Sequence, residues 1–363
     1  TGIDVTGTVT ATGTSVFASL DISGDIDVDG VTNLDAVDID GAVNIADNVT
    51  MASTNPILDL LADSNNDATL RLRESGTGIV GAEFIYDGGD NALYLKIGNN
   101  SANTALKIAR DDGSLSTPTA GTSNVRFGVN AGNSIASGGN YNTVVGDEAG
   151  TALTTGDGNV AIGFNALKTE DANGQNVAIG FKALEDLNAG ADGLNTAVGY
   201  SAGLNVTTGI QNTLIGGYAG DALTDADFNV AVGTDALTAD TLGSRSVAIG
   251  RRSLYTQNFT SATDAYNVGV GFNAGYSVTT GIQNTFVGGL SGDATTTANS
   301  NAAFGYGSLG ANTTGAQNVA LGSGALFSNT TASNNTAVGL NTLLANTTGA
   351  NNVAVGSFAL DAN

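Results

Sequence analysis

The sequence lacks several residue types on which common classes of protein depend. Among its 363 residues there is no Cys, no His and no Trp, and there are only two Pro and one Met. Without Cys the chain forms neither disulfides nor thiolate metal sites, and without His it lacks the commonest general base and zinc ligand. The same absences exclude nucleophilic triads that contain His or Cys.

Basic residues are also scarce. The chain has 11 Lys and Arg against 34 Asp and Glu, which gives a net charge of −23. This charge repels a phosphate backbone, so we expect no nucleic-acid partner. No run approaches the roughly 18 consecutive apolar residues of a membrane-spanning helix, so we expect no membrane insertion.

The residues that are abundant favour thin, stacked β-structure. Gly accounts for 52 residues, and the hydrophobic fraction of 41% is too high for a disordered chain. Most of that fraction is small or β-branched, which provides little material for a thick globular core.

One phrase, N-x-x-[apolar]-G, recurs along the C-terminal two thirds of the chain. Ten of its thirteen intervals are 17 residues long, and regular spacing of this kind indicates a solenoid. A helix does not fit between the glycines of successive copies. The fourteen copies begin at Asn124, Asn142, Asn159, Asn176, Asn195, Asn212, Asn229, Ser246, Asn267, Asn284, Asn301, Asn318, Asn335 and Asn352.

Each copy predicts a short strand that ends at a tight corner. The second and fourth residues are β-branched or apolar and the third is usually Ala, so the strand has an apolar face and a face of small residues. We expect a second short strand where Ala or Ser precedes Leu or Gly. The closing glycines, where we expect φ > 0 or no room for a side chain, are Gly128, Gly146, Gly163, Gly180, Gly199, Gly216, Gly233, Gly250, Gly271, Gly288, Gly305, Gly322, Gly339 and Gly356.

One such coil has too few large apolar side chains to offset the entropy lost when its residues are ordered. We therefore expect self-association that buries the Ala-rich face. The energetic argument does not distinguish two copies from three, and we predict a homotrimer.

The ninth residue of successive coils follows a longer period, with two Gly followed by two Leu. This pattern indicates that blocks of four coils were duplicated. Its members are Gly132, Gly150, Leu167, Leu184, Gly203, Gly220, Leu237, Leu254, Gly275, Gly292, Leu309 and Leu326, followed by Leu343 and Leu360.

The phrase N-V-A-I-G-x-x-A-L at 159–167 resembles the head repeat of trimeric autotransporter adhesins, which forms a left-handed parallel β-roll in each of three chains. The N-T-A-V-G at 335–339 and the N-T-T-G turn at 346–349 resemble fibre proteins of tailed bacteriophages. The resemblance covers 124–363, although the coils are longer than the usual adhesin repeat.

The resemblance implies a structural and host-adhesion segment of a phage tail fibre. Such a segment lies outside the cell on the virion, extends toward the bacterial surface, and contacts other tail proteins and a glycan or protein receptor. One alternative is the head region of a trimeric bacterial surface adhesin. Another is a pure spacer whose receptor-binding tip lies elsewhere.

We therefore predict an all-β fibrous homotrimer with a β-solenoid, or parallel β-roll, of about fourteen 17-residue coils at 119–363. Alternating segments at 68–73, 81–86, 92–97 and 105–109 predict a small antiparallel β-domain at 56–118. Residues 1–55 alternate Ile or Val with Asp or Thr, and for them the phage-fibre resemblance implies an intertwined triple-stranded β-helix shaft. We expect the array to continue beyond Asn363, because its last coil is not an atypical capping coil.

The longest coil, which begins at Ser246, carries an unusual cationic and aromatic group. We interpret this group either as a receptor-contact loop or as a bulged loop packed on its neighbour. Its members are Arg251, Arg252, Tyr255, Phe259 and Tyr266.

The acidic residues predict no metal site, cofactor or catalytic site. The D-x-D-x-D-G run at 25–30 matches the opening of an EF-hand loop, but its twelfth position is Ala36 rather than Glu. A solvated strand face is therefore the preferred interpretation. We expect the clusters at 221–227 and 169–171 to be solvated too. No coil displays the pair of carboxylates that glycoside hydrolysis needs, so we expect no enzymatic activity.

Overall fold

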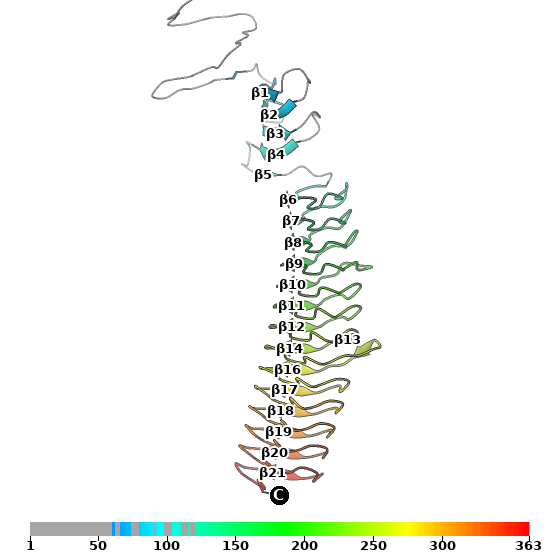
Figure 1. Cartoon of the computed structure of the whole chain (residues 1–363), viewed down its shortest axis with the longest axis vertical. Coiled ribbons are helices and arrows are strands. Elements are labelled where there is room, and N and C mark those ends of the chain that lie inside the picture. Colours follow the sequence, from blue (N-terminus) through cyan, green and yellow to red (C-terminus); the bar gives the residue numbers. More distant parts are fainter. Residues whose placement is uncertain are drawn as a thin grey trace, which may run out of the picture. The chain divides into compact units, whose positions relative to one another are not determined.

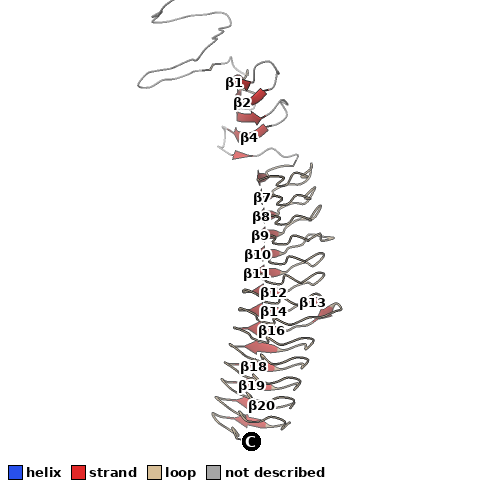
Figure 2. Ribbon diagram, in the orientation of Figure 1, coloured by secondary structure: helices blue, strands red, loops and turns tan. Residues whose placement is uncertain are grey.

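The computed structural model describes residues 60–61, 66–73, 80–89, 92–97, 104–109, 115–116 and 121–362. The predicted shaft at 1–55 and the motif at 25–30 lie outside these residues. Every regular element of the described residues is a strand, and none is a helix (Figures 1 and 2).

The first five strands form an antiparallel sheet in chain order. The four strands expected from the alternating pattern are present, and a short fifth strand follows them. Their bounds are β1 (Ala68–Arg73), β2 (Val80–Asp87), β3 (Ala92–Ile97), β4 (Thr104–Ala109) and β5 (Leu115–Ser116).

The following region is a parallel β-solenoid of fourteen turns, as predicted. Each turn contributes one three-residue strand that begins directly after the first residue of the repeated phrase, and the strands form one fourteen-stranded sheet (Figure 1). At about 4.8 Å per strand, the stack is roughly 60 Å long. The strands are β6 (Val125–Phe127), β7 (Thr143–Val145), β8 (Val160–Ile162), β9 (Val177–Ile179), β10 (Thr196–Val198), β11 (Thr213–Ile215), β12 (Val230–Val232), β14 (Val247–Ile249), β16 (Val268–Val270), β17 (Thr285–Val287), β18 (Ala302–Phe304), β19 (Val319–Leu321), β20 (Thr336–Val338) and β21 (Val353–Val355).

The corner glycines behave as predicted. All fourteen have φ between 124° and 144°, a region that other residues rarely adopt. At Gly163 an added Cβ would lie 2.6 Å from the carbonyl carbon of Gly180 in the next coil. Both the backbone conformation and the spacing between coils therefore require glycine at this corner.

The prediction that the Ala-rich face of the strands is buried by self-association was wrong. Except in β6, the third residue of the phrase, such as Ala161 or Ala178, is the middle residue of its strand and is buried inside its own chain, whereas the second and fourth residues of the phrase remain at least partly exposed. The coil is thin: at Gly269, which takes the third position, an added Cβ would lie 3.0 Å from the backbone oxygen of Ala274 in the same coil. The third residue of these phrases therefore packs inside its own coil and is not free for self-association.

The predicted second strand is absent from the coils within 121–362. Leu167 and Leu184, at the ninth position, adopt the left-handed conformation with φ of 51° and 49°. Leu167 N still donates to Ala183 O of the next coil at 3.0 Å. Stacking therefore continues at this position, but an isolated left-handed residue does not continue as a strand.

The first residue of each phrase has a role that we had not predicted. The Asn side chains are buried and form a ladder: Asn159 N donates to Asn142 Oδ1 at 2.9 Å, and Asn176 N donates to Asn159 Oδ1 at 3.0 Å. The amide of Asn142 donates in turn to Gly156 O at 2.8 Å. Each Asn thus satisfies backbone groups that the corner leaves without a strand partner.

The block pattern at the ninth position is explained by the volume of the core. The two Gly coils of each block surround one large buried residue at the third position, which is Val144, Leu214 or Phe286. An added Cβ on Gly275 would lie 2.9 Å from Phe286 Cδ2, and one on Gly292 would lie 2.7 Å from Phe286 Cζ. In the other coils Leu at the ninth position fills this volume and Ala takes the third position, as in Ala231 and Leu237.

Candidate receptor-contact and buried polar sites

The structure divides the five receptor-contact candidates. The coil that begins at Ser246 is 21 residues long, four more than the usual 17. Thr241 Oγ1 and Asn258 Oδ1, which are 17 residues apart, still lie 3.1 Å from each other in adjacent coils. The four additional residues therefore follow Asn258. Phe259 and Tyr266 belong to this longer segment. The candidates that precede it, at regular positions of the coil, are Arg251, Arg252 and Tyr255.

The three regular candidates make cation–aromatic and stacking contacts, both within their own coil and with neighbouring coils. The Arg252 guanidinium lies 5.3 Å from the Tyr255 ring centre, and its Nε is 3.3 Å from Asp235 Oδ2. Tyr255 stacks on Tyr276 at 5.0 Å with an interplanar angle of 3°. Arg251 is exposed and lies 6.0 Å from the ring of Phe272. This group offers one exposed guanidinium beside aromatic rings, which suits an anionic or π-rich group.

Phe259 does not belong to a contact surface. Its side chain is 6% exposed and packs over Gly243, where an added Cβ would lie 2.7 Å from Phe259 Cδ2. Here the bulged-loop interpretation is correct. The segment is held by a short parallel pair, β13 (Gly243–Ser244) and β15 (Thr263–Asp264).

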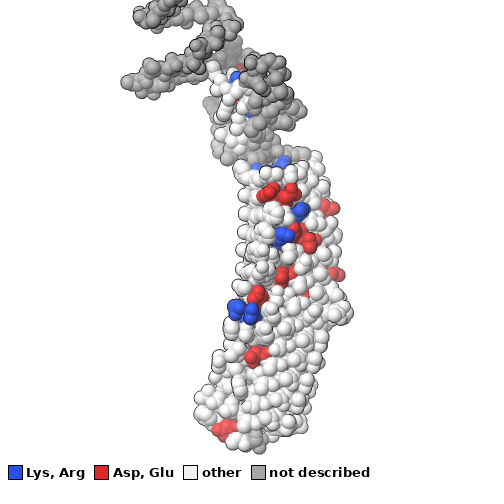
Figure 3. Space-filling view, viewed as in Figure 1, with Lys and Arg blue, Asp and Glu red and all other residues white. Residues whose placement is uncertain are grey.

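Tyr266 belongs to a separate polar cluster. It is 51% exposed, and its hydroxyl lies 3.3 Å from Asp264 Oδ2. Arg245 Nε donates to Asp264 Oδ1 at 3.0 Å, and the Arg245 guanidinium lies 4.5 Å from the Phe228 ring centre. On the face in Figure 3, charged side chains gather on the part of the solenoid nearer its N-terminal end, and few appear beyond it.

A buried carboxylate supports the longest coil. Asp240 Oδ1 accepts hydrogen bonds from Gly243 N at 3.0 Å and Phe259 N at 3.1 Å, and Oδ2 accepts from Gln257 Nε2 at 2.6 Å. Gln257 Nε2 also donates to Ser246 Oγ, and Gln257 Oε1 accepts from Asn267. This network bridges the one coil in which Ser replaces the ladder Asn. Burial raises the pKa of Asp240, and the hydrogen bonds partly oppose this shift.

Glu170 plays the same part for the next-longest coil. It is buried, and its carboxylate accepts hydrogen bonds from Ala189 N at 3.1 Å and Asn173 N at 3.2 Å. Burial raises its pKa. The expectation that the cluster at 169–171 is solvated was therefore wrong for this residue. The sequence did contain a sign of this role, because Glu170 and Asp240 each occupy the twelfth position of the coil that precedes a longer coil.

Comparison with known proteins gives no match. No protein-family model matches the chain, and neither a curated protein nor a solved structure matches it. Within the described ranges no helix is long and apolar enough to cross a membrane. The same residues contain no group of three or more Asp or Glu that is placed to hold a metal ion.

Exposed aromatic side chains form a ladder on the coils after β8. Phe164 stacks on Phe181 at 5.3 Å, Phe181 on Tyr200 at 5.0 Å, and Tyr200 meets Tyr218 edge to face at 5.2 Å. In the first two pairs the interplanar angles of 18° and 9° show that the rings cover one another. The ladder therefore stabilises the stack and exposes mainly ring edges.

Proposed function

We propose that the chain is a structural and adhesive segment of a homotrimeric fibre, of the kind carried by phage tails, that extends from the virion toward the bacterial surface. The observation that carries the proposal is the partly exposed apolar face of the fourteen-stranded sheet. The second and fourth residues of the phrase, such as Val160 and Ile162, repeat along its whole length. The fourth residue is Val, Ile, Leu or Phe in all fourteen phrases, whereas five of the second residues are Thr. The continuous apolar row of fourth residues marks an interaction site.

Identical copies are the partners that best match this face. Its side chains recur once per coil, so parallel copies in register meet coil by coil with the same chemistry. The antiparallel sheet adds a second surface, because Phe84, Tyr86, Leu93 and Ile108 are exposed on one face of it. Self-association covers both surfaces without any other protein.

The linear stack supports a fibre role. The strands pair in chain order from β6 to β21, so the two ends of the array lie at opposite ends of the stack. Each coil contacts mainly its neighbours, and the length of such an array grows with the number of coils. The proposal therefore assigns the chain two roles: the stack provides length to the fibre, and its repeated lateral surface contacts identical copies.

A charge placed on the sheet face tests the proposed interface. Ile215 is 39% exposed at the fourth position of its phrase, and Ile215→Glu puts a charge where a partner is expected. Sedimentation should show dissociation of the trimer into smaller species. Asn188→Asp, at an exposed loop position, is the control and should leave the mass unchanged. Equal masses for both variants and the unmodified chain would rule out this face as the interface.

An in-frame deletion separates a receptor-binding segment from a pure spacer. Removal of residues 195–266 joins Leu194 to Asn267 and takes out four whole coils, including the Arg251 group. If this part only provides length, adsorption to bacterial cells is retained. Loss of adsorption from a folded trimer assigns receptor contact to the deleted coils. Immunogold labelling of virions against cell envelopes distinguishes the tail fibre from the surface adhesin.

A further inference from the structure

Two successive coils lack a side chain at the seventh position. Gly307 and Gly324 occupy it with φ of 61° and 64°, whereas the other twelve coils carry a side chain there. A hollow of about 340 Å³ opens at these coils, lined by Tyr306, Gly307, Ser323, Gly324, Phe327, Asn341 and Leu344. The hollow thus exists because of a local departure from the repeat.

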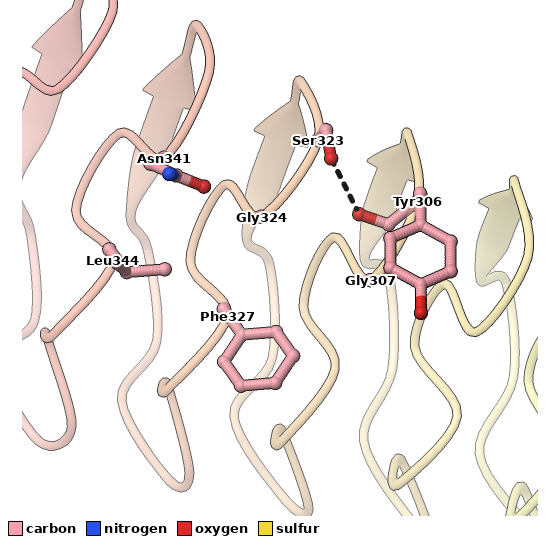
Figure 4. A pocket seen from close by; sticks show the side chains of 7 residues that line it. All are labelled: Tyr306, Gly307, Ser323, Gly324, Phe327, Asn341 and Leu344. Atoms are coloured by element: carbon pink, nitrogen blue, oxygen red, sulfur yellow. Dashed lines mark hydrogen bonds between the residues drawn. The ribbon is translucent and has the colours of Figure 1, made fainter.

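Two aromatic rings border the hollow. Tyr306 is 65% exposed at one end, and Phe327 is 47% exposed beside the two glycines (Figure 4). An added Cβ on Gly307 would lie 3.5 Å from Phe327 Cδ2, so the ring lies along the glycine backbone. Unlike the ladder that begins at Phe164, neither ring stacks on another aromatic ring within residues 121–362. They therefore remain available to a ligand.

The polar groups around the rings are neutral and largely free. Within residues 121–362, the side-chain amide of Asn341 and the Tyr306 hydroxyl make no hydrogen bond to another residue. Ser323 Oγ donates weakly to Tyr306 O at 3.3 Å (Figure 4). From Ala294 to Leu360 the sequence contains no Asp, Glu, Lys or Arg. No charged side chain from these coils is therefore present to pair with a carboxylate, a phosphate or an amine.

We propose that this hollow binds one neutral sugar unit of a bacterial surface glycan. The apolar face of the sugar ring packs on Tyr306 and Phe327, while its hydroxyls bond to the Asn341 amide and the Ser323 and Tyr306 hydroxyls. The volume lies at the lower end of the range for small-ligand sites, which suits a single ring. The inference rests on the proposed adhesive function and names the receptor chemistry for it.

The test is ligand-observed NMR on the intact chain with glucose, galactose, mannose and N-acetylglucosamine. Glucuronate and glucose 6-phosphate serve as charged probes. Two variants perturb the hollow: Tyr306→Ala removes a wall, and Gly307→Asn fills the floor. Asn at the same position adopts φ of 55° in Asn273 and 52° in Asn341, so Gly307→Asn is compatible with the fold. Tyr200→Ala is the matched control, because Tyr200 occupies the same coil position away from the hollow.

We expect saturation transfer to at least one neutral sugar, about tenfold weaker binding in each hollow variant, and unchanged binding in the control. Preference for a charged probe, equal weakening by Tyr200→Ala, or no binding to any sugar overturns the proposal. A fall in sedimentation mass for Tyr306→Ala also overturns it, because the hollow is then a subunit contact. If trimers still adsorb to cells although no sugar binds, only this inference fails. If the unmodified chain neither trimerises nor adsorbs, the proposed function fails.

Discussion

Phe286 provides a quantitative test of how the core is packed. Its ring is fully buried and takes the volume that Leu at the ninth position fills in most other coils. Phe286→Ala should cost about 3–5 kcal/mol of unfolding free energy, as large-to-small core substitutions do. Gly292→Leu should cost about 1–3 kcal/mol by overpacking, because its added side chain meets the ring.

The double variant Phe286→Ala/Gly292→Leu recreates the arrangement of the next coil, which has Ala303 and Leu309. Leu309 adopts φ of 54° at the equivalent position, close to the 56° of Gly292, so the backbone accepts Leu without rearrangement. The new side chain fills the cavity that the lost ring leaves. We therefore expect the double variant to be more stable than the sum of the single effects predicts, by at least about 2 kcal/mol.

Urea unfolding followed by circular dichroism measures the four members of this cycle. Hydrogen exchange over residues 267–317 checks that the loss of protection begins in the altered coils, as nearest-neighbour stacking requires. Effects that add to within about 0.5 kcal/mol would show that Phe286 and Gly292 do not share one volume, and would refute our account of the block pattern.

Three further predictions concern the corner, the ladder and the buried acids. Gly163→Val should reduce hydrogen-exchange protection first in its own coil and then in adjacent coils. Gly190→Val is the control and should not reduce protection, because no atom of a non-neighbouring residue lies within 4 Å of the new Cβ. Equal protection in both variants would contradict the corner argument. Asn318→Ala leaves buried backbone groups without partners and should lower the free energy of unfolding in urea by about 1–3 kcal/mol. Asn205→Ala, at an exposed position, is the control and should lower it by less than about 1 kcal/mol. Equal losses in the two variants would contradict the stabilising role of the Asn ladder. Burial raises the pKa of Asp240 in the folded chain, so the stability that this group contributes is present below its ordinary value of 3.8 and is lost as pH rises through the folded pKa. Melting temperature should therefore fall as pH rises above 3.8, less steeply in Asp240→Asn, and an identical slope in the variant would contradict this assignment.

The regular part of the fold could be predicted because the repeat has one structural solution. A constant spacing of 17 residues with glycine at fixed positions sets the strand starts and the corners, as at Val160 and Gly163. Alternation also showed that the third residue of the phrase faces away from the second and fourth. It did not show which side faces the coil interior, because both sides carry apolar residues. The distance between opposite walls decides this, as at Gly269, and that distance is a tertiary property.

The polar interior was harder to predict from the sequence. The ladder Asn and the Asn of the N-T-T turns were both consistent with surface turns, yet Asn312 and Asn329 are fully buried, and Asn329 Nδ2 donates to Asn312 Oδ1 at 2.9 Å. Buried amides are rare in globular cores, but identical stacked coils place each amide beside its own copy. The sequence placed Arg251 and Phe259 in one candidate contact surface, but Phe259 is buried in the bulge of the longest coil and does not face solvent.

The central claim is that identical copies associate through the exposed face of the fourteen-stranded sheet. The mass of the chain in solution, measured by sedimentation equilibrium at several concentrations, tests this claim most directly. We predict a single species of three times the chain mass of 35.9 kDa that does not dissociate on dilution. A folded, stable species of 35.9 kDa would contradict the claim, because it would show that the apolar face needs no partner.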